Sequence, residues 1–475
     1  MEESSIFCNF VLLILKININ QQTPINNQFV KKIAFHTLGC KLNFAETSAI
    51  GRTLLERGFV RAKKGETADI CIINTCSVTD TADKKCRQAI HKFTANHPNA
   101  FVVVTGCYAQ LKPQEVSDIQ GVDLVVGSNE KFEIADILQQ IEEKSSECHC
   151  GQLLPFGRES FPSFGGGRGK LQPLDNFNKI NVVETSQIVD FQSIYSADDR
   201  TRHFLKVQDG CDYYCTYCTI PFARGKSRNS NIISTLEVVK KAISEGAKEI
   251  VLTGINIGDF GKSTGETFFD LIKEIDKIPA EVRYRISSIE PNLLSDEIIE
   301  FVANSQHFTP HFHIPLQSGS NAVLALMKRR YSRELFRDKI LKIKELMPNA
   351  FIGVDVMVGM RGETDEYFTE TYNFLQNIPF SQLHVFTYSE REGTKALDIQ
   401  PIIPQKERKR RSEILHQLSA QKLADFYQSQ KGKTAVVLWE EGKNKSIMSG
   451  FTENYVRVSA NYDKNLINTF QKVII

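Results

Sequence analysis

Apolar and polar residues follow two alternating periodicities along most of the chain, and this pattern predicts α/β structure. Between residues 31 and 143, short apolar runs that are typical of buried strands alternate with stretches of helical periodicity. The strand runs are Ile33–Thr37, Ile70–Asn74, Phe101–Thr105 and Leu124–Val126, and the helical stretches are Glu46–Arg57, Ala82–Phe93 and Glu130–Ile141. Because strands and helices alternate, we expect an open parallel α/β sheet that is covered by helices on both faces.

The same alternation returns between residues 200 and 400, where it continues through six strand–helix units. The strand runs are His203–Gln208, Glu249–Thr253, Val282–Ser287, Phe312–Leu316, Phe351–Val358 and Leu383–Tyr388. The helical stretches between them include Ile232–Glu245, Thr267–Ile278, Ser332–Leu346 and Thr364–Asn377. Six consecutive units predict a partial (β/α)6 barrel that is related to the eightfold one.

The remaining segments complete the predicted organisation around these two parts. Residues 1–30 form a leader that we expect to be disordered, and the Gly- and Ser-rich residues 144–199 predict a linker or surface insertion. Residues 401–428 predict one amphipathic helix, which extends the barrel unit to residues 200–428. Within residues 429–475, three short β runs predict a small β-barrel. These runs are Ala435–Trp439, Ile447–Ser449 and Tyr455–Ser459.

Composition and charge narrow the class of protein. A chain of 475 residues is too long for one core. A net charge of +2 excludes a polycationic chain, so any contact with nucleic acid must use a local basic surface. The apolar run Phe10–Leu15 is too short to span a membrane, and without a secretion signal we expect a cytoplasmic protein with no membrane partner. Eleven cysteines are an odd count for a disulfide framework, which favours reduced thiols that bind metal.

The strongest motif is a set of three cysteines that follows the first predicted barrel strand. Cys211, Cys215 and Cys218 have the spacing C-x3-C-x2-C. Three thiolates on one loop can hold three irons of a cubane cluster and leave the fourth iron without a protein ligand. The carboxyl end of a barrel strand is also where barrel enzymes place their chemistry. The alternative is a zinc site, but structural zinc normally takes four protein ligands, and no fourth partner lies nearby.

A second set of three cysteines lies in the N-terminal part. Cys40, Cys76 and Cys107 each follow the end of a predicted strand by two or three residues. Loops at the carboxyl ends of parallel strands share one crevice, so these distant cysteines can converge into a second three-thiolate site. The alternative is three buried thiols that act as small apolar side chains. Their position in loops, where function concentrates, favours the metal site.

The other cysteines have simpler interpretations. Cys71 lies inside an apolar strand and is expected in the core, whereas Cys86 lies on a polar helix and has no visible partner. Cys8 belongs to the leader. The Cys-His-Cys sequence at residues 148–150 lies in the predicted linker, where a solvated loop lacks the fixed geometry of a metal site.

The stretch Cys211–Cys218, with an aromatic residue before its last cysteine, resembles the cluster motif of the radical S-adenosylmethionine (SAM) superfamily. The resemblance covers nearly all of residues 200–400. It implies a [4Fe-4S] cluster whose open iron binds SAM and cleaves it to a 5′-deoxyadenosyl radical. It also implies SAM contacts, for which ordinary packing at strand ends is the alternative. These are Tyr217 near the adenine, Thr253 and Gly254 at the amino group, Ser288 and Glu290 at the ribose and methionine, and Asp355 within an adenine-lining Gly353–Val356.

Taken together, the two cysteine sets resemble the radical SAM methylthiotransferase family over roughly residues 31–475, with residues 144–199 as an unmatched insertion. Four motifs look most like the branch that acts on N6-threonylcarbamoyladenosine in tRNA. They are Thr37–Asn43, Gln208–Cys211, Ile220–Gly225 and Gly450–Tyr455. The resemblance implies two [4Fe-4S] clusters, and conversion of this nucleoside at position 37, beside the anticodon, to its 2-methylthio derivative.

The family also implies a reaction in two stages. One SAM donates a methyl group to sulfur at the Cys40, Cys76 and Cys107 cluster. A second SAM, at the other cluster, gives the radical that activates carbon 2 of the adenine ring, which has no acidic proton for acid–base catalysis to remove. The implied partners are tRNA, SAM and an electron donor such as a flavodoxin.

The C-terminal β segment resembles a TRAM domain, an RNA-binding module. RNA affinity comes largely from Lys and Arg on phosphates, although charge runs are usually solvated faces. The candidate contacts are Lys431, Lys433, Lys443, Lys445, Arg457, the run Lys406–Arg411 and the run Lys328–Arg330. One residue departs from the family pattern: Arg361 stands where members usually carry a proline, which puts the shape of that loop in doubt.

Three rival functions remain open at the level of sequence. A methylthiotransferase that acts on a ribosomal protein side chain would share every cysteine. A non-catalytic, zinc-bound RNA-binding protein would contain zinc in place of iron and sulfide. A radical SAM enzyme with a different product would cleave SAM and leave tRNA unchanged.

Overall fold

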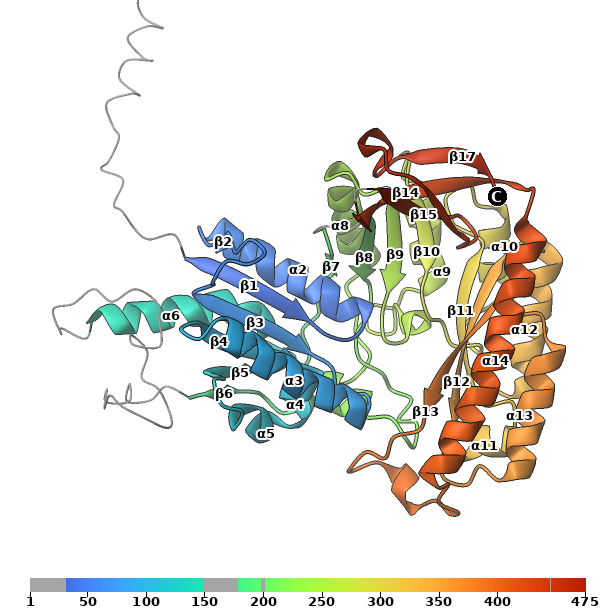
Figure 1. Ribbon diagram of the computed structural model, residues 1–475, viewed down its shortest axis with the longest axis horizontal. Helices are drawn as coiled ribbons and strands as arrows, with labels where there is room; N and C mark the ends of the chain where they lie inside the picture. Colours follow the sequence, from blue (N-terminus) through green and yellow to red (C-terminus); the bar gives the residue numbers. More distant parts are fainter. Residues whose placement is uncertain (1–30, 148–177, 198–200, 445) are drawn as a thin grey trace, which may run out of the picture.

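The computed structural model describes residues 31–147, 178–197, 201–444 and 446–475. The leader expected over residues 1–30, with Cys8, and the Cys-His-Cys sequence at residues 148–150 lie outside the described residues. The described chain forms an N-terminal α/β unit, a parallel barrel and a C-terminal antiparallel sheet (Figure 1). Within these residues, no helix is long and apolar enough to cross a membrane.

The N-terminal unit is a six-stranded parallel sheet of order β2-β1-β3-β4-β5-β6. Its strands are β1 (Lys32–Thr37), β2 (Val60–Arg61), β3 (Ile70–Thr75), β4 (Phe101–Gly106), β5 (Leu124–Val126) and β6 (Ile180–Asn181). Its helices are α2 (Lys41–Glu56), α3 (Asp80–Asn96), α4 (Cys107–Leu111), α5 (Pro113–Ser117) and α6 (Ile134–Glu147), with the 3-10 turn η1 (Glu130–Glu133). Separate apolar clusters fill the two faces of this sheet, as the unbroken apolar runs predicted.

The barrel contains the six parallel strands that the sequence predicted. They are β8 (Arg202–Lys206), β9 (Glu249–Thr253), β10 (Arg283–Ile286), β11 (His311–Gln317), β12 (Phe351–Val358) and β13 (Gln382–Thr387). Isolated parallel bridges, Tyr284 to Phe308 and Ser288 to His313, join the β8–β10 sheet to the β11–β13 sheet. The outer helices are α8 (Ile232–Ser244), α9 (Phe268–Asp276), α10 (Asp296–Asn304), α11 (Asn321–Leu326), α12 (Arg333–Leu346) and α13 (Asp365–Asn377).

The long barrel helices begin where the sequence provides a capping side chain. The N-cap side chain of each of five helices accepts a hydrogen bond from the backbone N–H three residues on. These caps are Asn231, Thr267, Ser295, Ser332 and Thr364. The inner faces of the helices and strands enclose the largest apolar cluster of the described chain.

The prediction of a linker over residues 144–199 is wrong for residues 144–147, which belong to helix α6, and for residues 178–197. Here β6 joins the edge of the N-terminal sheet beside β5, and β7 (Ile194–Tyr195) pairs antiparallel with β8. Between them lies the 3-10 turn η2 (Thr185–Gln187). Two-residue strands are too short to show a periodicity, so only the edge hydrogen bonds that they complete reveal them.

The chain ends in a long helix and a curled sheet. Helix α14 (Gln405–Gln430) runs along the barrel beside β13, close to the predicted bounds (Figure 1). Strands β14 (Thr434–Asn444), β15 (Ile447–Thr452), β16 (Arg457–Asn461) and β17 (Phe470–Ile474) form an antiparallel sheet of order β16-β15-β14-β17. This half-barrel is consistent with the predicted TRAM-like domain. The sequence pattern did not predict β17.

Candidate cysteine-rich active site at the domain interface

The structure brings Cys40, Cys76 and Cys107 to one edge of the N-terminal sheet. Cys40 follows β1 and is the N-cap of α2, Cys76 follows β3, and Cys107 is the first residue of α4 after β4. Gly39 has a φ of +107°, and a Cβ added there would lie 2.7 Å from the Cβ of Cys76. The Cys40 and Cys76 loops are therefore in contact, and only glycine fits between them.

The three sulfurs of this set are also close enough to influence one another's ionisation. Burial, followed by negative charge on Cys107 and Cys40, raises the pKa of Cys76 to about 12. Burial also raises the pKa of Cys107, while Arg224 opposes that rise. Three neighbouring thiols in such a place lose their protons together only when a cationic group binds them. The donor set thus fits an iron–sulfur cluster.

Cys86 is not the partnerless residue on a polar helix that the sequence predicted. It is buried on α3, where its Sγ accepts a hydrogen bond from the backbone N–H of Cys76 at 3.4 Å. The same sulfur donates to the carbonyl oxygen of Cys76 at 3.2 Å. Cys86 therefore holds the Cys76 loop in place through its backbone. Cys71 lies in the core, as predicted.

Cys211, Cys215 and Cys218 lie together on the loop between β8 and the short helix α7 (Ile220–Arg224). Gly210, at a φ of +72°, allows the loop to start, because a Cβ there would lie 2.0 Å from the carbonyl oxygen of Lys226. Burial is the main cause that raises the pKa of Cys218 to about 12, and negative charge on Cys215 and Cys211 contributes to the rise. The three thiols thus form a second donor set of the same kind.

Arg329 supports this second set. Its Nη1 donates to the Sγ of Cys215 at 3.1 Å, and its Nη2 forms an ion pair with Glu290. Burial raises the pKa of Cys215, and Arg329 opposes that rise, which favours a thiolate. The interpretation of Lys328–Arg330 as phosphate contacts is therefore wrong for Arg329, whose side chain is 4% exposed. In the sequence, Arg329 could be recognised only as part of a basic run.

The residues expected to contact SAM have different surroundings in the structure. Glu290 is linked to the cysteine loop through Arg329, and Ser288, bridged to β11, lies two residues before it. Gly254 packs so closely on Gln208 that a Cβ would lie 2.8 Å from its Oε1. The remaining residues have local partners: Thr253 Oγ1 donates to the carbonyl of Val251, Tyr217 packs in an apolar cluster, and Asp355 is hydrogen-bonded to His313.

A buried charge network joins the two cysteine sets across the domain interface. Arg224, at the end of α7, contacts Glu46 of α2 at 2.9 Å and Asp209 at 3.0 Å. Lys131 contacts Glu46 at 2.7 Å, and Lys206 contacts Asp209 at 2.9 Å. Although burial acts to raise the pKa of Glu46, Arg224 and Lys131 lower it to about 2. Glu46 is therefore ionised in the folded protein at neutral pH.

The same arginine reaches the first cysteine set directly. Arg224 Nη2 donates to Asn43 Oδ1 at 2.7 Å, and that oxygen accepts from Cys40 Sγ at 3.6 Å. On the other side, Arg391 contacts Asp83 at 2.9 Å and donates to Ser77 Oγ at 2.8 Å. Two arginines from the barrel unit thus fix the loops of Cys40 and Cys76, which sequence reasoning did not predict.

Several basic residues that were considered for RNA binding have structural partners. Arg408 and Arg411 of the run Lys406–Arg411 are buried, and Arg411 forms an ion pair with Glu363 at 2.8 Å. The interpretation of this run as RNA contacts is therefore wrong for Arg408 and Arg411. Lys406, Lys409 and Arg410 are exposed. Lys431, Lys433 and Arg457 are exposed too, and the side chains of Lys443 and Lys445 lie outside the described part.

Arg361, where a proline was expected, anchors its loop by polar contacts. Its Nε donates to Glu390 at 2.9 Å, and its Nη1 bonds the carbonyl of Leu397. Gly359 and Gly362 on either side have φ values of +74° and +85°. The turn is therefore formed by glycines and side-chain bonds where a proline would have fixed φ.

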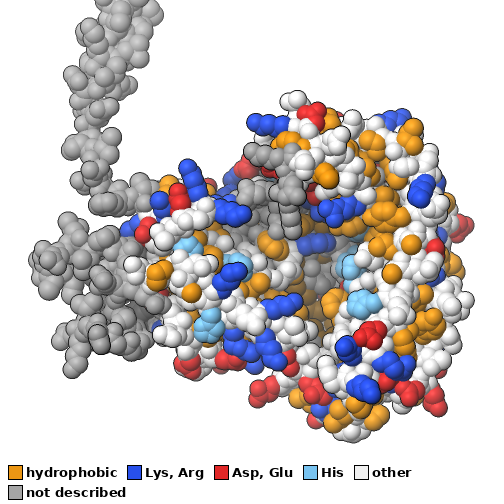
Figure 2. Space-filling view, viewed as in Figure 1, with side chains coloured by type: hydrophobic (Ala, Val, Ile, Leu, Met, Phe, Trp, Pro, Cys, Tyr) orange, Lys and Arg blue, Asp and Glu red, His pale blue; other side chains and the backbone are white. Residues whose placement is uncertain are grey.

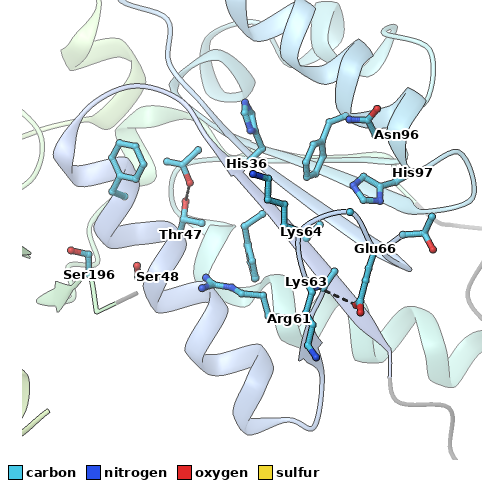
Figure 3. Close-up of a pocket in the computed structure, with 18 residues that line it drawn as sticks. His36, Thr47, Ser48, Arg61, Lys63, Lys64, Glu66, Asn96, His97 and Ser196 are labelled. Atoms are coloured by element: carbon cyan, nitrogen blue, oxygen red, sulfur yellow. Dashed lines mark hydrogen bonds between the residues drawn. The ribbon is translucent and has the colours of Figure 1, made fainter. Parts of the chain in front are cut away.

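A cavity of about 1050 Å³ lies away from both cysteine sets, at the β1–β2 edge of the N-terminal sheet. Cationic and imidazole side chains line much of it: His36, Arg61, Lys63, Lys64 and His97. Figure 3 shows Lys64 reaching toward His36, with Arg61 on the α2 side. Between the N-terminal unit and the barrel, Figure 2 shows a separate hollow with Lys and Arg side chains inside it and histidines on its barrel side.

Comparisons with known proteins agree with this architecture. Residues 32–127 match the model of the uncharacterized protein family UPF0004, and residues 205–375 match the Radical SAM superfamily. The solved structure of the radical S-adenosylmethionine methyltransferase TsrM from Kitasatospora setae shares the fold, with a TM-score of 0.54 and 14% identity over 75% of this chain and 73% of that one. Fold and cysteine loop together define a radical SAM enzyme with an additional cysteine-bearing N-terminal domain.

Relatives over nearly the whole chain identify the family. The threonylcarbamoyladenosine tRNA methylthiotransferase MtaB of Bacillus subtilis is 36% identical over 93% of both chains. That of Aquifex aeolicus is 36% identical over 90% of this chain and 96% of its own. The tRNA-2-methylthio-N(6)-dimethylallyladenosine synthase of Protochlamydia amoebophila is 29% identical over 94% of both. The chain belongs to the radical SAM tRNA methylthiotransferase family, in its MtaB-type branch.

Proposed function

We propose that this enzyme converts N6-threonylcarbamoyladenosine at position 37 of tRNA to its 2-methylthio derivative. The observation that carries the proposal is the match to two MtaB enzymes at 36% identity, which spans the N-terminal unit and the barrel together. The two cysteine sets lie on units that a buried ion-pair network holds in contact. Sulfur held at one set and a radical formed at the other can therefore meet at one base.

Cys211, Cys215 and Cys218 would hold the [4Fe-4S] cluster that binds SAM, and Cys40, Cys76 and Cys107 would hold a second cluster. When bound, the first supplies reductive cleavage of SAM, and the second supplies a site for sulfur and its methylation. Arg329 would stabilise the thiolate of Cys215 and orient Glu290, which stands beside the SAM site. Thr253, Gly254 and Ser288 are proposed as further SAM contacts, with Tyr217 packed behind the adenine.

The tRNA would be held by local basic surfaces, since the whole chain carries little net charge. The exposed Lys431 and Arg457 of the C-terminal unit are proposed to contact the backbone of the anticodon arm. The cavity lined by Arg61, Lys63 and Lys64 is proposed as a further phosphate site on the N-terminal unit. A one-electron donor of the flavodoxin type is proposed to reduce the SAM-binding site.

The test is an anaerobic assay of the protein reconstituted with iron and sulfide. It is supplied with SAM, a one-electron reductant and tRNA that either carries or lacks the threonylcarbamoyl group, and the nucleosides are analysed by mass spectrometry. We expect the 2-methylthio derivative from the threonylcarbamoylated tRNA, with 5′-deoxyadenosine and S-adenosylhomocysteine as coproducts.

Two outcomes would contradict the proposal. Formation of 5′-deoxyadenosine from SAM without any change in tRNA would assign the radical chemistry to another substrate. Retention of the methylthio nucleoside in a strain that lacks the gene, together with loss of a methylthio group from a ribosomal protein, would move the activity to the protein side chain.

A further inference from the structure

A lysine from the N-terminal unit reaches into the barrel without a partner. Lys41 is the first residue of α2, which packs against β7 and β8. Its ammonium lies within electrostatic reach of Arg285, Asp355 and Glu249, which belong to three different barrel strands. In the described part of the chain, Lys41 neither donates a hydrogen bond nor forms an ion pair. A desolvated cation that pairs directly with no carboxylate favours an anionic ligand.

Three polar side chains lie together on neighbouring strands of the barrel. His313 of β11, Asp355 of β12 and His384 of β13 offer nitrogen and oxygen atoms that all lie within 4.8 Å of one another. His313 Nε2 and Asp355 Oδ1 are 2.6 Å apart, and the two imidazole rings are 5.0 Å apart. The charge of Lys41 acts on His384, and the charge of Asp355 acts on Lys41, so Lys41 belongs to the electrostatic surroundings of these three residues. Each of the three barrel residues is partly exposed, so a ligand can reach them.

The same three residues have the composition of a metal site with two histidines and one carboxylate. Lys41 argues against that use, because its positive charge would oppose a metal cation near His384. Arg285 and Arg202 add further positive charge around Lys41. The surroundings thus favour a ligand that is anionic on the side of Lys41 and carries hydrogen-bonding groups on the side of Asp355.

We infer that Lys41, His313, Asp355 and His384 form the subsite that binds the amino-acid substituent on the adenine. This inference rests on the proposed function. The threonyl group carries a carboxylate, which Lys41 pairs with, and a hydroxyl, which fits between Asp355 as acceptor and an imidazole as donor. The Asp355 carboxylate repels the substrate carboxylate, so the substituent binds in one orientation.

The test is a thermodynamic cycle that combines a protein variant with removal of the substrate charge. Two anticodon stem–loop RNAs are used, one with threonylcarbamoyladenosine and one with its methyl ester, which lacks the negative charge. Their dissociation constants are measured with the reconstituted protein. For the unaltered protein we expect the acid to bind about 10- to 100-fold more tightly than the ester. This preference should vanish in Lys41→Met and survive in part in Lys41→Arg.

Controls separate this role from general RNA binding and from damage at the neighbouring Cys40. Arg457→Met, on the exposed face of the C-terminal sheet, should weaken both RNAs equally. Iron and sulfide content shows whether Lys41→Met retains its clusters. If Lys41→Met loses a cluster, the His384→Ala variant, altered in the barrel, is tested in its place. It should lower the preference for the threonyl RNA over one whose substituent is glycyl and lacks the hydroxyl.

Three results would overturn the inference: equal weakening of acid and ester in Lys41→Met, no preference in the unaltered protein, or a bound zinc or iron that is lost in His384→Ala. If the unaltered protein methylthiolates the RNA yet binds acid and ester equally, the subsite inference is refuted and the proposed function remains intact. An unaltered protein that does not methylthiolate the RNA would refute the proposed function instead.

Discussion

Cys86 and Cys76 differ in what their sulfurs contact, although both lie close to the proposed cluster. The Sγ of Cys86 bonds the backbone N–H and the carbonyl of Cys76, so it acts on the loop. The pKa of Cys76 is instead raised, after burial, by negative charge on Cys107 and Cys40. Cys76 would therefore bind iron, whereas Cys86 positions Cys76.

Replacement of Cys86 by alanine should therefore leave cluster binding intact and lower stability. The partly buried N–H and carbonyl of Cys76 would lose these partners, which costs about 1–3 kcal/mol in the free energy of unfolding. Iron analysis should give the same content as the unaltered protein, and urea unfolding should show the loss. Cys76→Ala is the matched comparison and should lose one cluster. Equal loss of iron in both variants would make Cys86 a ligand and refute this assignment.

Sequence reasoning at the residue scale predicted the candidate cysteine ligands and missed the side chains that support their loops. The N-terminal set could be predicted because each of its cysteines follows a strand whose apolar run is visible, and the barrel set because of its C-x3-C-x2-C spacing. Arg329 and Arg391 could not, because their partners Cys215 and Asp83 are more than a hundred residues away. A basic run predicts charge, and only packing decides whether that charge is buried.

At the scale of elements, α2 and α7 are joined by charges rather than by an apolar surface alone. Glu46, Arg224, Asp209, Lys131 and Lys206 are each at most 2% exposed. The cations exceed the carboxylates in this set, and both Arg224 and Lys131 oppose the rise in the pKa of Cys107. The network thus favours anionic sulfur at the first site while it fixes the position of the second.

Removal of Arg224 should disrupt this junction. Arg224→Met leaves Glu46 and Asp209 with fewer buried partners, and we expect a loss of about 3–5 kcal/mol in the free energy of unfolding. Arg57→Met is the matched control, because it breaks an exposed ion pair with Asp136 at 2.6 Å and should cost at most about 1 kcal/mol. Chemical unfolding of both variants checks the contrast. Equal effects would show that the buried network does not stabilise the interface.

The C-terminal sheet is attached to the barrel through Glu249. Its carboxylate forms ion pairs with Arg283 and Arg285, and those arginines donate to the carbonyls of Phe451 and Glu453. Although burial acts to raise the pKa of Glu249, Arg285 and Arg283 lower it to about 2. The Gly450–Tyr455 motif, noted in the sequence for its family resemblance, thus forms the contact between the two units.

This depressed pKa predicts a specific loss of stability in acid. A carboxyl group whose folded pKa lies below its unfolded value stabilises the protein above about pH 4.5 and loses that contribution as the pH falls toward 2. The contribution at neutral pH is about 3 kcal/mol. Urea unfolding can be followed by Trp439, the single tryptophan, which is buried in the C-terminal sheet. The stability difference between the unaltered protein and Glu249→Gln should narrow below pH 4.5, and a constant difference would contradict the assignment.

Across the whole molecule, a hollow lies between the N-terminal unit and the barrel (Figure 2), and the order of the three units could be predicted from the sequence. The barrel strands Glu249–Thr253 and Phe351–Val358 have the predicted bounds, because long apolar runs between capped helices leave little ambiguity. Strands β6 and β7 were missed because two residues carry no periodicity. The subsite around Lys41 was also invisible in the sequence, since it combines the first turn of α2 with three barrel strands.

The central claim is that the protein carries two three-thiolate iron–sulfur sites, and chemical analysis of iron and acid-labile sulfide tests it most directly. The reconstituted protein should contain about eight irons and eight sulfides per chain. Replacement by alanine of Cys40, Cys76 and Cys107 together, or of Cys211, Cys215 and Cys218 together, should leave about four of each. One or two zinc ions in place of iron, or a triple variant that keeps all its iron, would contradict the account.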